Sequence, residues 1–330
     1  MRTLDDTMTA LRAAAEPTRL RILALCADGE VTVSELVRIL GQSQPRISRH
    51  LKVLTAAGLL SRTPEGSWVF HRLAQEGPQA DLAARLIALA PLDDETLRRD
   101  RERLAQIKHE RAAEAARYFD DNAASWERQR SLHVDEAEVE AAILALAPEQ
   151  VGRHLDLGTG TGRMLELLAG RAEFGQGIDL SREMLAIART NLDRAGLSHC
   201  QVRQADLTQL PFAADSFDLV TIHQVLHFMS DPDRAIEAAA GVLKPGGTLL
   251  IVDFAPHREE ALRQDHQHRR LGFADKEPQA WCRAAGLTPT AVRHLKGDPL
   301  TVTLWGAVKP AAVDAAAATR PAAHRTLETA

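Results

Sequence analysis

Residues 153–162 have the sequence RHLDLGTGTG, a short apolar strand that runs into glycines at every second position. Glycines allow a tight turn and let a bound nucleotide approach the backbone closely. The spacing is G-x-G-x-G, and Arg163 stands where the dinucleotide fingerprint G-x-G-x-x-G requires a glycine. Asp156, two residues before the turn, would also repel a pyrophosphate. We therefore expect a cofactor that carries positive charge.

Two further acidic residues follow later strands in a stretch where strand-like and helical segments alternate, a pattern that predicts a parallel sheet. Asp179 ends the strand-like stretch 175–180, where a carboxylate accepts hydrogen bonds from two ribose hydroxyls. Asp206 follows the stretch 200–203 and is placed to accept a hydrogen bond from an adenine amino group. A ligand with adenine, ribose and a positive charge is S-adenosylmethionine.

Five segments in order, DLGTGTG, GIDLS, QADL, SFDLV and LKPGGTLLIVD, resemble the class I S-adenosylmethionine-dependent methyltransferases over about residues 118–309. The resemblance implies a Rossmann-like domain with a mostly parallel seven-stranded sheet and S-adenosylmethionine as cofactor. It implies that Asp206 borders the adenine, that Asp156 lies near the methionine end, and that residues 118–126 form a helix over the site. The cofactor-binding residues that it predicts are Asp156, Gly158, Gly160, Gly162, Asp179, Leu180, Asp206 and Leu207.

The first 73 residues differ from the rest in charge. They hold ten Lys and Arg against seven Asp and Glu, a net charge of +3, which leaves −8 for the remainder of a chain whose total is −5. The asymmetry indicates a small DNA-directed module joined to a larger acidic one.

Residues 41–58, GQSQPRISRHLKVLTAAG, predict a helix with Ser43 as N-cap and Gly58 after its last turn. An earlier helix over residues 32–40 joins it through Gly41, which is the helix-turn-helix layout. The apolar stripe of the second helix is formed by Ile47, Leu51 and Leu54. Its opposite face is polar and basic, so we expect this helix to enter the major groove of DNA.

Two strands predicted over residues 59–63 and 67–73 enclose a turn at 64–66 and form a wing. Long polar side chains on the reading helix reach base edges, and Lys and Arg neutralise phosphates. The partner is then double-stranded operator DNA. The predicted DNA-binding residues are Ser43, Gln44, Arg46, Ser48, Arg49, Lys52 and Arg62.

The segments EPTRLRIL, TVSEL, SQPRISRHLK and GLL, all within residues 8–75, resemble the ArsR/SmtB family of winged helix-turn-helix regulators. The resemblance implies a homodimer that binds an inverted-repeat operator through contacts of the first helix and of the helix after the wing. Leucines at helical spacing in the latter form either a dimer seam or ordinary core: Leu82, Leu86 and Leu89. Where relatives bind metal through cysteines, residues 30–35 read EVTVSE, so no metal site is predicted.

We therefore expect an α/β protein of two domains joined by a connector. From 93 to 117, 14 of 25 residues are charged, and Asp94 with Arg98 and Glu95 with Arg99 are i,i+4 pairs, which indicates an exposed helix. The predicted parts are a winged helix domain over residues 1–92, a charged helical connector over 93–117, a methyltransferase domain over 118–309 and a disordered tail over 310–330.

Methyl transfer from a sulfonium is an in-line displacement, so the protein orients the acceptor and supplies a base. His223 and His227, after the fourth strand, are the predicted catalytic residues, with lining of the site as the alternative. A second group, His257, His266 and His268, is followed by two arginines and would bind an anionic acceptor or a metal. DNA methylation is disfavoured, because residues 222–225 read IHQV where amino-methylating DNA enzymes carry N/D-P-P-Y/F.

Two function classes remain. In the first, the protein is a transcription regulator that also methylates a small molecule. In the second, it is a repressor whose methyltransferase fold senses S-adenosylmethionine or S-adenosylhomocysteine without turnover.

Membrane and secretory classes are excluded by the pattern of apolar residues. The longest apolar runs, residues 86–92 and 248–252, are far shorter than the roughly 18 residues that span a bilayer. Residues 1–17 lack the apolar stretch of a secretory signal. The widely spaced cysteines form neither a disulfide framework nor a C-x-x-C pair, which indicates a cytoplasmic protein: Cys26, Cys200 and Cys282.

Overall fold

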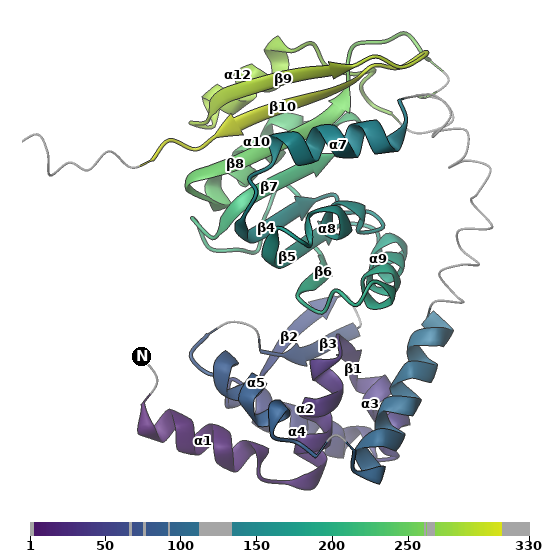
Figure 1. Cartoon of the computed structure of the whole chain (residues 1–330), viewed down its shortest axis with the longest axis vertical. Helices are drawn as coiled ribbons and strands as arrows, with labels where there is room; N and C mark the ends of the chain where they lie inside the picture. The colour runs from purple at the N-terminus through teal and green to yellow at the C-terminus, as the bar shows by residue number, and fades with distance from the viewer. Residues whose placement is uncertain are drawn as a thin grey trace, which may run out of the picture.

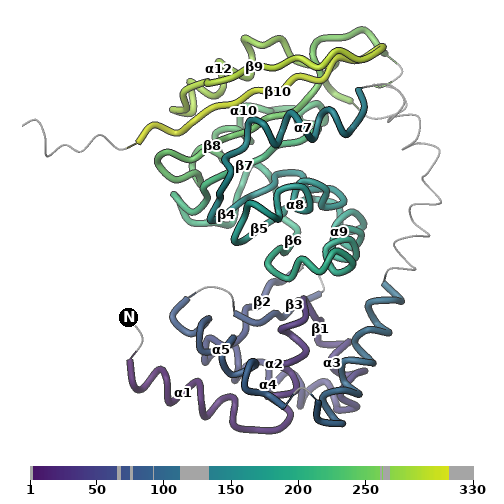
Figure 2. Tube along the Cα trace, in the orientation of Figure 1, coloured from purple at the N-terminus to yellow at the C-terminus, as the bar shows by residue number. Residues whose placement is uncertain are grey.

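A computed structural model describes residues 3–65, 68–74, 77–91, 93–111, 134–260, 262 and 268–311. The helix predicted over 118–126, His266 and the tail beyond residue 311 lie outside this range. The Cα trace in Figure 2 shows two bodies stacked along the long axis, the first built from the purple and blue N-terminal residues and the second from the teal to yellow ones.

The N-terminal domain is a winged helix-turn-helix, as predicted. Its sheet has the strand order β1-β3-β2, and β2 and β3 pair as the antiparallel wing (Figure 1). Its elements are α1 (Leu4–Ala14), α2 (Pro17–Ala27), β1 (Val31–Thr32), α3 (Val33–Leu40), α4 (Gln44–Ala56), β2 (Leu60–Glu65), β3 (Trp68–Leu73) and α5 (Ala80–Ala88).

Local signals fix the ends of the two helices of the reading motif. Thr32 caps α3 in a capping box with Glu35, and Gly41 ends the helix with a left-handed φ of 65°. Ser43 is the N-cap of α4, as predicted, but its side chain makes no capping hydrogen bond. Gly58 follows α4 with a φ of 70°. The predicted apolar stripe is buried in the domain core: Ile47, Leu51 and Leu54.

Residues 95–111 are helical, but they are not an exposed connector. Leu104 and Ile107 are buried and join the core of the N-terminal domain. Asp100 is buried as well and accepts two hydrogen bonds from Arg21 on α2, at 2.6 and 2.8 Å. The helix packs beside α3 (Figure 1, the blue helix without a label). Its apolar stripe is narrow, and the many charged residues around it made the segment look solvent-exposed in the sequence.

The predicted charge pairs on this helix form only in part. Glu95 pairs with Arg99. Asp94 does not pair with Arg98, because its Oδ1 accepts a hydrogen bond from the backbone N–H of Thr96 at 2.8 Å and so caps the first turn.

The C-terminal domain is the predicted Rossmann-like α/β fold. Its seven-stranded sheet has the order β6-β5-β4-β7-β8-β10-β9, in which only β10 pairs antiparallel, with β8 and with β9. The strands are β4 (Val151–Leu157), β5 (Ala172–Asp179), β6 (Cys200–Gln204), β7 (Phe217–His223), β8 (Leu243–Phe254), β9 (Thr288–Leu295) and β10 (Val302–Val308).

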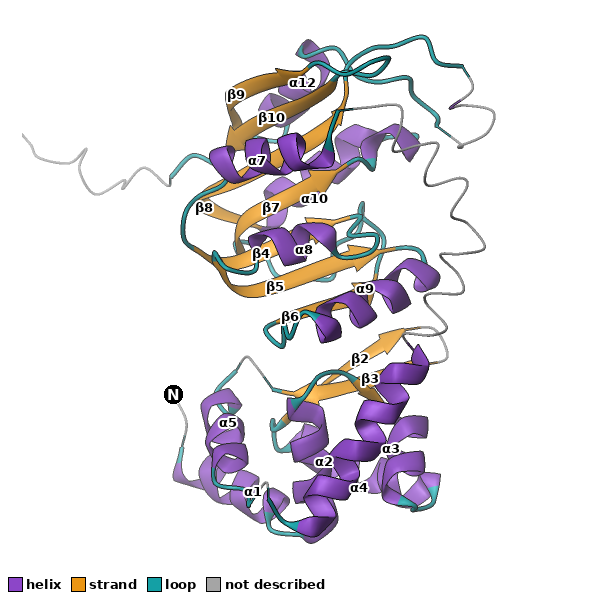
Figure 3. Cartoon of the chain, turned by 45° about the vertical axis from the view of Figure 1, so that its right-hand side comes forward, coloured by secondary structure: helices purple, strands orange, loops and turns teal. Residues whose placement is uncertain are grey.

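Helices cover both faces of this sheet (Figure 3). One face carries α7 (Glu136–Leu146), α8 (Arg163–Leu168) and α9 (Arg182–Arg194), and the other carries α10 (Pro232–Val242) and α12 (Lys276–Ala284). The parallel strands β4 to β8 therefore end together at one edge, where ligands bind in folds of this type. Within the described part of the chain, no helix is long and apolar enough to cross a membrane.

Candidate functional site

The glycine turn after β4 adopts a conformation that other residues rarely take. Gly158, Gly160 and Gly162 have φ values of 73°, 51° and 86°. A Cβ on Gly158 would stand 2.5 Å from a methyl carbon of Val225, which follows β7. The turn is thus pressed against the next strand end, and only glycine fits there.

Asp179 lies beside this turn, as the sequence predicts. Its Oδ2 accepts a hydrogen bond from the backbone N–H of Gly160, and its Oδ1 accepts one from Ser181, both at 2.9 Å. Leu180 is 60% exposed and presents an apolar surface next to the carboxylate. The turn and Asp179 together form a cradle that joins the ends of β4 and β5.

The two residues predicted at the adenine differ in exposure. Asp206 is exposed after β6, and hydrogen bonds from the backbone N–H and hydroxyl of Thr208, each 2.8 Å long, lower the pKa of its carboxyl. Leu207 is buried in the core under the sheet. Its side chain faces the core, and its place beside the adenine stays a prediction.

Asp156 belongs to a buried polar chain that links β4 and β7. The hydroxyl of Thr221 donates to its Oδ1 at 2.7 Å, and His154 Nε2 lies 2.8 Å from the same hydroxyl. Because the hydroxyl hydrogen goes to Asp156, His154 must donate from Nε2. Burial raises the pKa of Asp156 to about 6 and lowers that of His154 to about 3.

The two predicted catalytic histidines stand at different points of the strand end. His223 is the last residue of β7 and is half-buried. Gln224 follows with a φ of 51°, unusual for a residue with a side chain, and turns the chain toward the glycine loop. His227 lies in the short 3₁₀ helix η1 (Leu226–Phe228) and is fully buried, 2.8 Å from Asp253 at the end of β8.

The second histidine group is only partly assembled with the first. His268 stacks on His227 with ring centroids 4.0 Å apart, and His257 packs edge-on against Phe254. Burial lowers the pKa of His257. Within the described ranges, no cluster of three or more His, Cys, Asp or Glu side chains is placed to hold a metal ion.

The predicted DNA-binding surface is open to solvent. All its side chains on α4 and the wing are exposed: Ser43, Gln44, Arg46, Ser48, Arg49, Lys52 and Arg62. Cys26 is buried in α2, and burial raises its thiol pKa to about 12.

The two domains meet where the wing lies along β6, the edge strand of the large sheet (Figures 1 and 3). Arg189 on α9 pairs with Glu30 at 2.9 Å, and both side chains are only about one-tenth exposed. The Arg189 guanidinium also lies over the ring of Phe70, 3.9 Å from its centre. Arg72 on β3 is buried and donates to the carbonyl oxygen of Cys200 at 2.8 Å.

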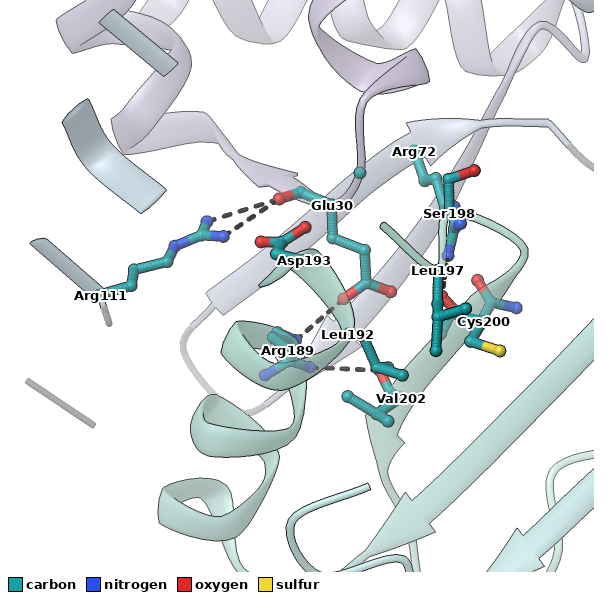
Figure 4. Close-up of a pocket in the computed structure, with 12 residues that line it drawn as sticks. Glu30, Arg72, Arg111, Arg189, Leu192, Asp193, Leu197, Ser198, Cys200 and Val202 are labelled. Atoms are coloured by element: carbon teal, nitrogen blue, oxygen red, sulfur yellow. Dashed lines mark hydrogen bonds and ion pairs between the residues drawn. The ribbon is translucent and has the colours of Figure 1, made fainter. Parts of the chain in front are cut away.

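Figure 4 shows this junction around a small pocket between the domains. Arg111, on the helix packed beside α3, reaches the carbonyl oxygen of Glu30 and the carboxylate of Glu35. Lys108 on the same helix pairs with Asp193 on α9 at 2.8 Å. Several charged groups thus bind the winged helix to α9.

Sequence reasoning missed Asp253 and the junction. Asp253 ends the apolar run of β8 as Asp156 and Asp179 end theirs, so its position at a strand end was a usable signal. Glu30 and Arg189 carry no local signal, because they are 159 positions apart in the chain.

Two family models match the chain. One describes bacterial regulatory proteins of the arsR family and matches residues 16–62, and the other describes a methyltransferase domain and matches residues 155–251. Both fall on the domains described above.

Relatives among known proteins match the C-terminal part. A demethylmenaquinone methyltransferase of Clavibacter sepedonicus is 31% identical over 234 residues, which are 62% of this chain and 93% of that protein. A ubiquinone biosynthesis O-methyltransferase of Paracidovorax citrulli is 29% identical over 174 residues, 48% of this chain and 73% of that protein. The solved structure of the YcgJ protein of Bacillus subtilis, 20% identical, covers 54% of this chain and 100% of its own, with a TM-score of 0.46.

Proposed function

Because the chain belongs to the S-adenosylmethionine-dependent methyltransferases and carries an ArsR-family winged helix, we propose that it is a DNA-binding transcriptional regulator whose second domain methylates a small molecule. The observation that carries the proposal is the presence of an exposed basic reading helix and an intact cofactor cradle in one chain. A domain kept only for its fold would have no need of the glycine turn and its fixed carboxylate.

The cradle suits S-adenosylmethionine, the cofactor of the family. A side chain at Gly158 would clash with Val225, and one at Gly160 would strain the left-handed backbone, so glycine leaves the backbone open for a ligand to approach. We propose that Asp179 binds the ribose hydroxyls, that exposed Leu180 contacts the adenine face, and that Asp156 attracts the positively charged end. When bound, the cofactor supplies an activated methyl group, and the chain orients the acceptor and takes its proton. His223 and His227 are the candidates for the latter role.

DNA binding is tested by the double variant Arg46→Ala/Arg49→Ala. Fluorescence anisotropy on DNA from upstream of its own gene is expected to report at least a hundredfold weaker binding. The slope of log affinity against log salt falls by about one for each side chain that contacts a phosphate. The control, Arg194→Ala/Arg283→Ala, removes the same charge from exposed positions on the other domain. Equal affinity of the two double variants would refute the assignment of α4 as reading helix.

A homodimer is the form in which we propose that the protein binds DNA. α1 lies at the end of the winged helix domain away from β6 (Figure 1), and α5 packs against α2 and β3. Exposed apolar side chains gather on them: Leu4, Met8 and Leu11 on α1 and Leu89 after α5. Their spacing on α1 puts them on one face, and such a face is normally covered by a partner. Sedimentation of Leu11→Glu is expected to report a monomer.

A second candidate function, sensing of S-adenosylmethionine or S-adenosylhomocysteine without turnover, is favoured by α9. Ser181, the N-cap of this helix, donates to the carboxylate of Asp179, and Arg189 on the helix pairs with Glu30 of the winged helix. A ligand bound at the start of α9 would therefore be linked to the winged helix through this single helix.

The two candidates are separated by titrating the protein–DNA complex with each ligand in turn. A shift in operator affinity of about fivefold or more, without methyl transfer to any tested acceptor, supports the sensor. Unchanged operator affinity, with tight ligand binding confirmed by calorimetry, rules out the sensor and supports the enzyme.

A further inference from the structure

Asp253 and His227 form a buried pair where β7 and β8 end. His227 Nδ1 lies 2.8 Å from Asp253 Oδ1, and neither side chain has any exposed surface. The same carboxylate accepts hydrogen bonds from two backbone N–H groups, those of Phe254 at 2.8 Å and of His227 at 3.3 Å. A carboxyl group that accepts from several donors is ionised, so Nδ1 of His227 carries the hydrogen.

The other nitrogen of this ring, Nε2, is unpartnered within the part of the chain that the structure describes. Among the described residues, none offers a hydrogen bond to His227 Nε2, although the atom is sealed from solvent. A buried polar atom left without a hydrogen bond disfavours the folded state. An unpartnered lone pair behind an ionised carboxylate is the arrangement of a proton acceptor whose substrate is absent.

The location of the ring agrees with that role. Val225, two residues before His227, touches the glycine turn at Gly158, so η1 lies next to the cofactor cradle. The backbone carbonyl of His227 accepts hydrogen bonds from the N–H groups of Arg269 and Arg270, at 2.9 and 3.1 Å, and the ring of His268 stacks on that of His227. Asp253 thus fixes the ring of His227, and Arg269 and Arg270 fix its backbone. Both Asp253 and His227 lie at the carboxyl ends of the strands, where ligands bind in folds of this type.

We propose that Asp253 is a positioning residue that holds His227 with its hydrogen on Nδ1, so that Nε2 takes the proton from a hydroxyl acceptor. The inference rests on the proposed methyltransferase function. As the acceptor O–H bond breaks, its proton goes to Nε2 and its electron pair forms the bond to the methyl carbon, while the electron pair of the carbon–sulfur bond returns to sulfur. Asp253 then balances the charge of the imidazolium.

The surroundings of the ring indicate the class of acceptor. Aromatic rings surround His227, with centroids 4.0 Å away for His268, 4.1 Å for Phe228 and 5.3 Å for Phe254. These rings pack on the imidazole itself and make its surroundings apolar, and a neutral imidazole in such surroundings suits a neutral, weakly acidic hydroxyl. The structure thus points to a phenolic or enolic acceptor. A thiol, which ionises readily by itself, would gain little from the base.

The first test is independent of activity. Nitrogen-15 NMR of the ring nitrogens of His227, in the full chain with S-adenosylhomocysteine, is expected to find Nδ1 protonated and Nε2 bare at neutral pH. Asp253→Asn keeps the shape but offers an amide donor to Nδ1, so the hydrogen moves to Nε2. A proton on Nε2 in the wild-type protein would overturn the proposal, whether or not the variant folds.

The second test measures methyl transfer to two probes, 3,4-dihydroxybenzoate and 4-mercaptobenzoate, an aromatic thiol of similar shape that is already ionised at neutral pH. Asp253→Asn is expected to lower kcat for the catechol by about a hundredfold, with KM and the cofactor Kd changed less than twofold, and Asp253→Glu to restore part of it. Transfer to the thiol changes little. The control is Asp218→Asn. This change removes a carboxylate paired with Lys244 at the start of β7, at the ends of the strands away from the cofactor cradle.

The outcomes distinguish a failure of the proposed methyltransferase function from a failure of the proposed role of Asp253. Failure of the wild-type protein to bind the cofactor in calorimetry would refute the proposed function itself. Cofactor binding without transfer to the catechol, or equal loss of rate with catechol and thiol, would leave that function standing and overturn the role of Asp253.

Discussion

Asp179 carries the predicted contact with the cofactor ribose on a single side chain. Its carboxylate already accepts hydrogen bonds from two backbone N–H groups, so its position is fixed before a ligand arrives. Asp179→Ala removes charge-assisted hydrogen bonds to the ribose, each worth about 1.5–3 kcal/mol. We expect S-adenosylmethionine to bind at least tenfold more weakly in calorimetry. Glu173→Ala, at the exposed start of the same strand, is the control and should bind normally.

Asp156 is predicted to make cofactor binding depend on pH. Burial raises its pKa to about 6, so the group is mostly charged at pH 7 and mostly neutral at pH 5. A positively charged cofactor gains attraction only from the ionised form. Affinity should therefore fall by about tenfold from pH 7 to pH 5 in the wild-type protein and stay level in Asp156→Asn.

The free energy of unfolding of the unliganded protein should respond with the opposite sign. Because the folded-state pKa lies above that of an unfolded aspartate, the ionised group disfavours folding above pH 6. Asp156→Asn, which keeps an acceptor for Thr221, is then stabilising at pH 7 and neutral in effect at pH 4. A variant whose cofactor affinity follows the wild-type pH dependence would show that another group titrates.

The glycine turn is the element on which the cofactor site depends. Gly158→Ala places a methyl group 2.5 Å from Val225 at a φ of 73°, so either the turn or the end of β7 must move. We expect cofactor affinity to fall by tenfold or more while the fold persists. Gly170→Ala, where a Cβ meets nothing within 4 Å, should leave the affinity unchanged and serves as the matched control.

Elements with local signals could be predicted from the sequence. Thr32 and Glu35 mark the start of α3, Gly41 marks its end, and the glycine turn marks the end of β4. Each signal works through backbone hydrogen bonds or φ values within a few residues, so no knowledge of the fold is needed. The position of Asp179 could be predicted for the same reason, because this residue ends strand β5.

Elements defined by contacts between distant residues could not be predicted from the sequence. The helix over residues 95–111 has the composition of a solvated connector, and only packing against the winged helix distinguishes Leu104 as core. The pair of His227 and Asp253 joins residues 26 positions apart through the register of β7 with β8. The sequence shows that both residues are present, but it does not show that they are in contact.

In the whole molecule, the two domains are joined by charged groups rather than by an apolar seam. Glu30, Arg72 and Arg189 are nearly or fully buried at the junction, and each has a partner across or beside it. Charge-assisted hydrogen bonds of this kind require close geometry, so a small shift of one domain breaks them. If ligand binding shifts one domain, these contacts are the ones that would carry the change to the other.

The last prediction follows from that junction. If ligand binding changes operator affinity, Arg189→Ala should reduce the change from about fivefold or more to less than twofold, because α9 then no longer holds Glu30. The charge exchange Glu30→Arg/Arg189→Glu should restore part of the coupling, whereas the single Glu30→Arg should not. Arg194→Ala, exposed on the same helix, is the control. Full coupling in Arg189→Ala, with unchanged ligand affinity, would mean that the signal travels by another route, for which the buried contact of Arg72 with β6 is the next candidate.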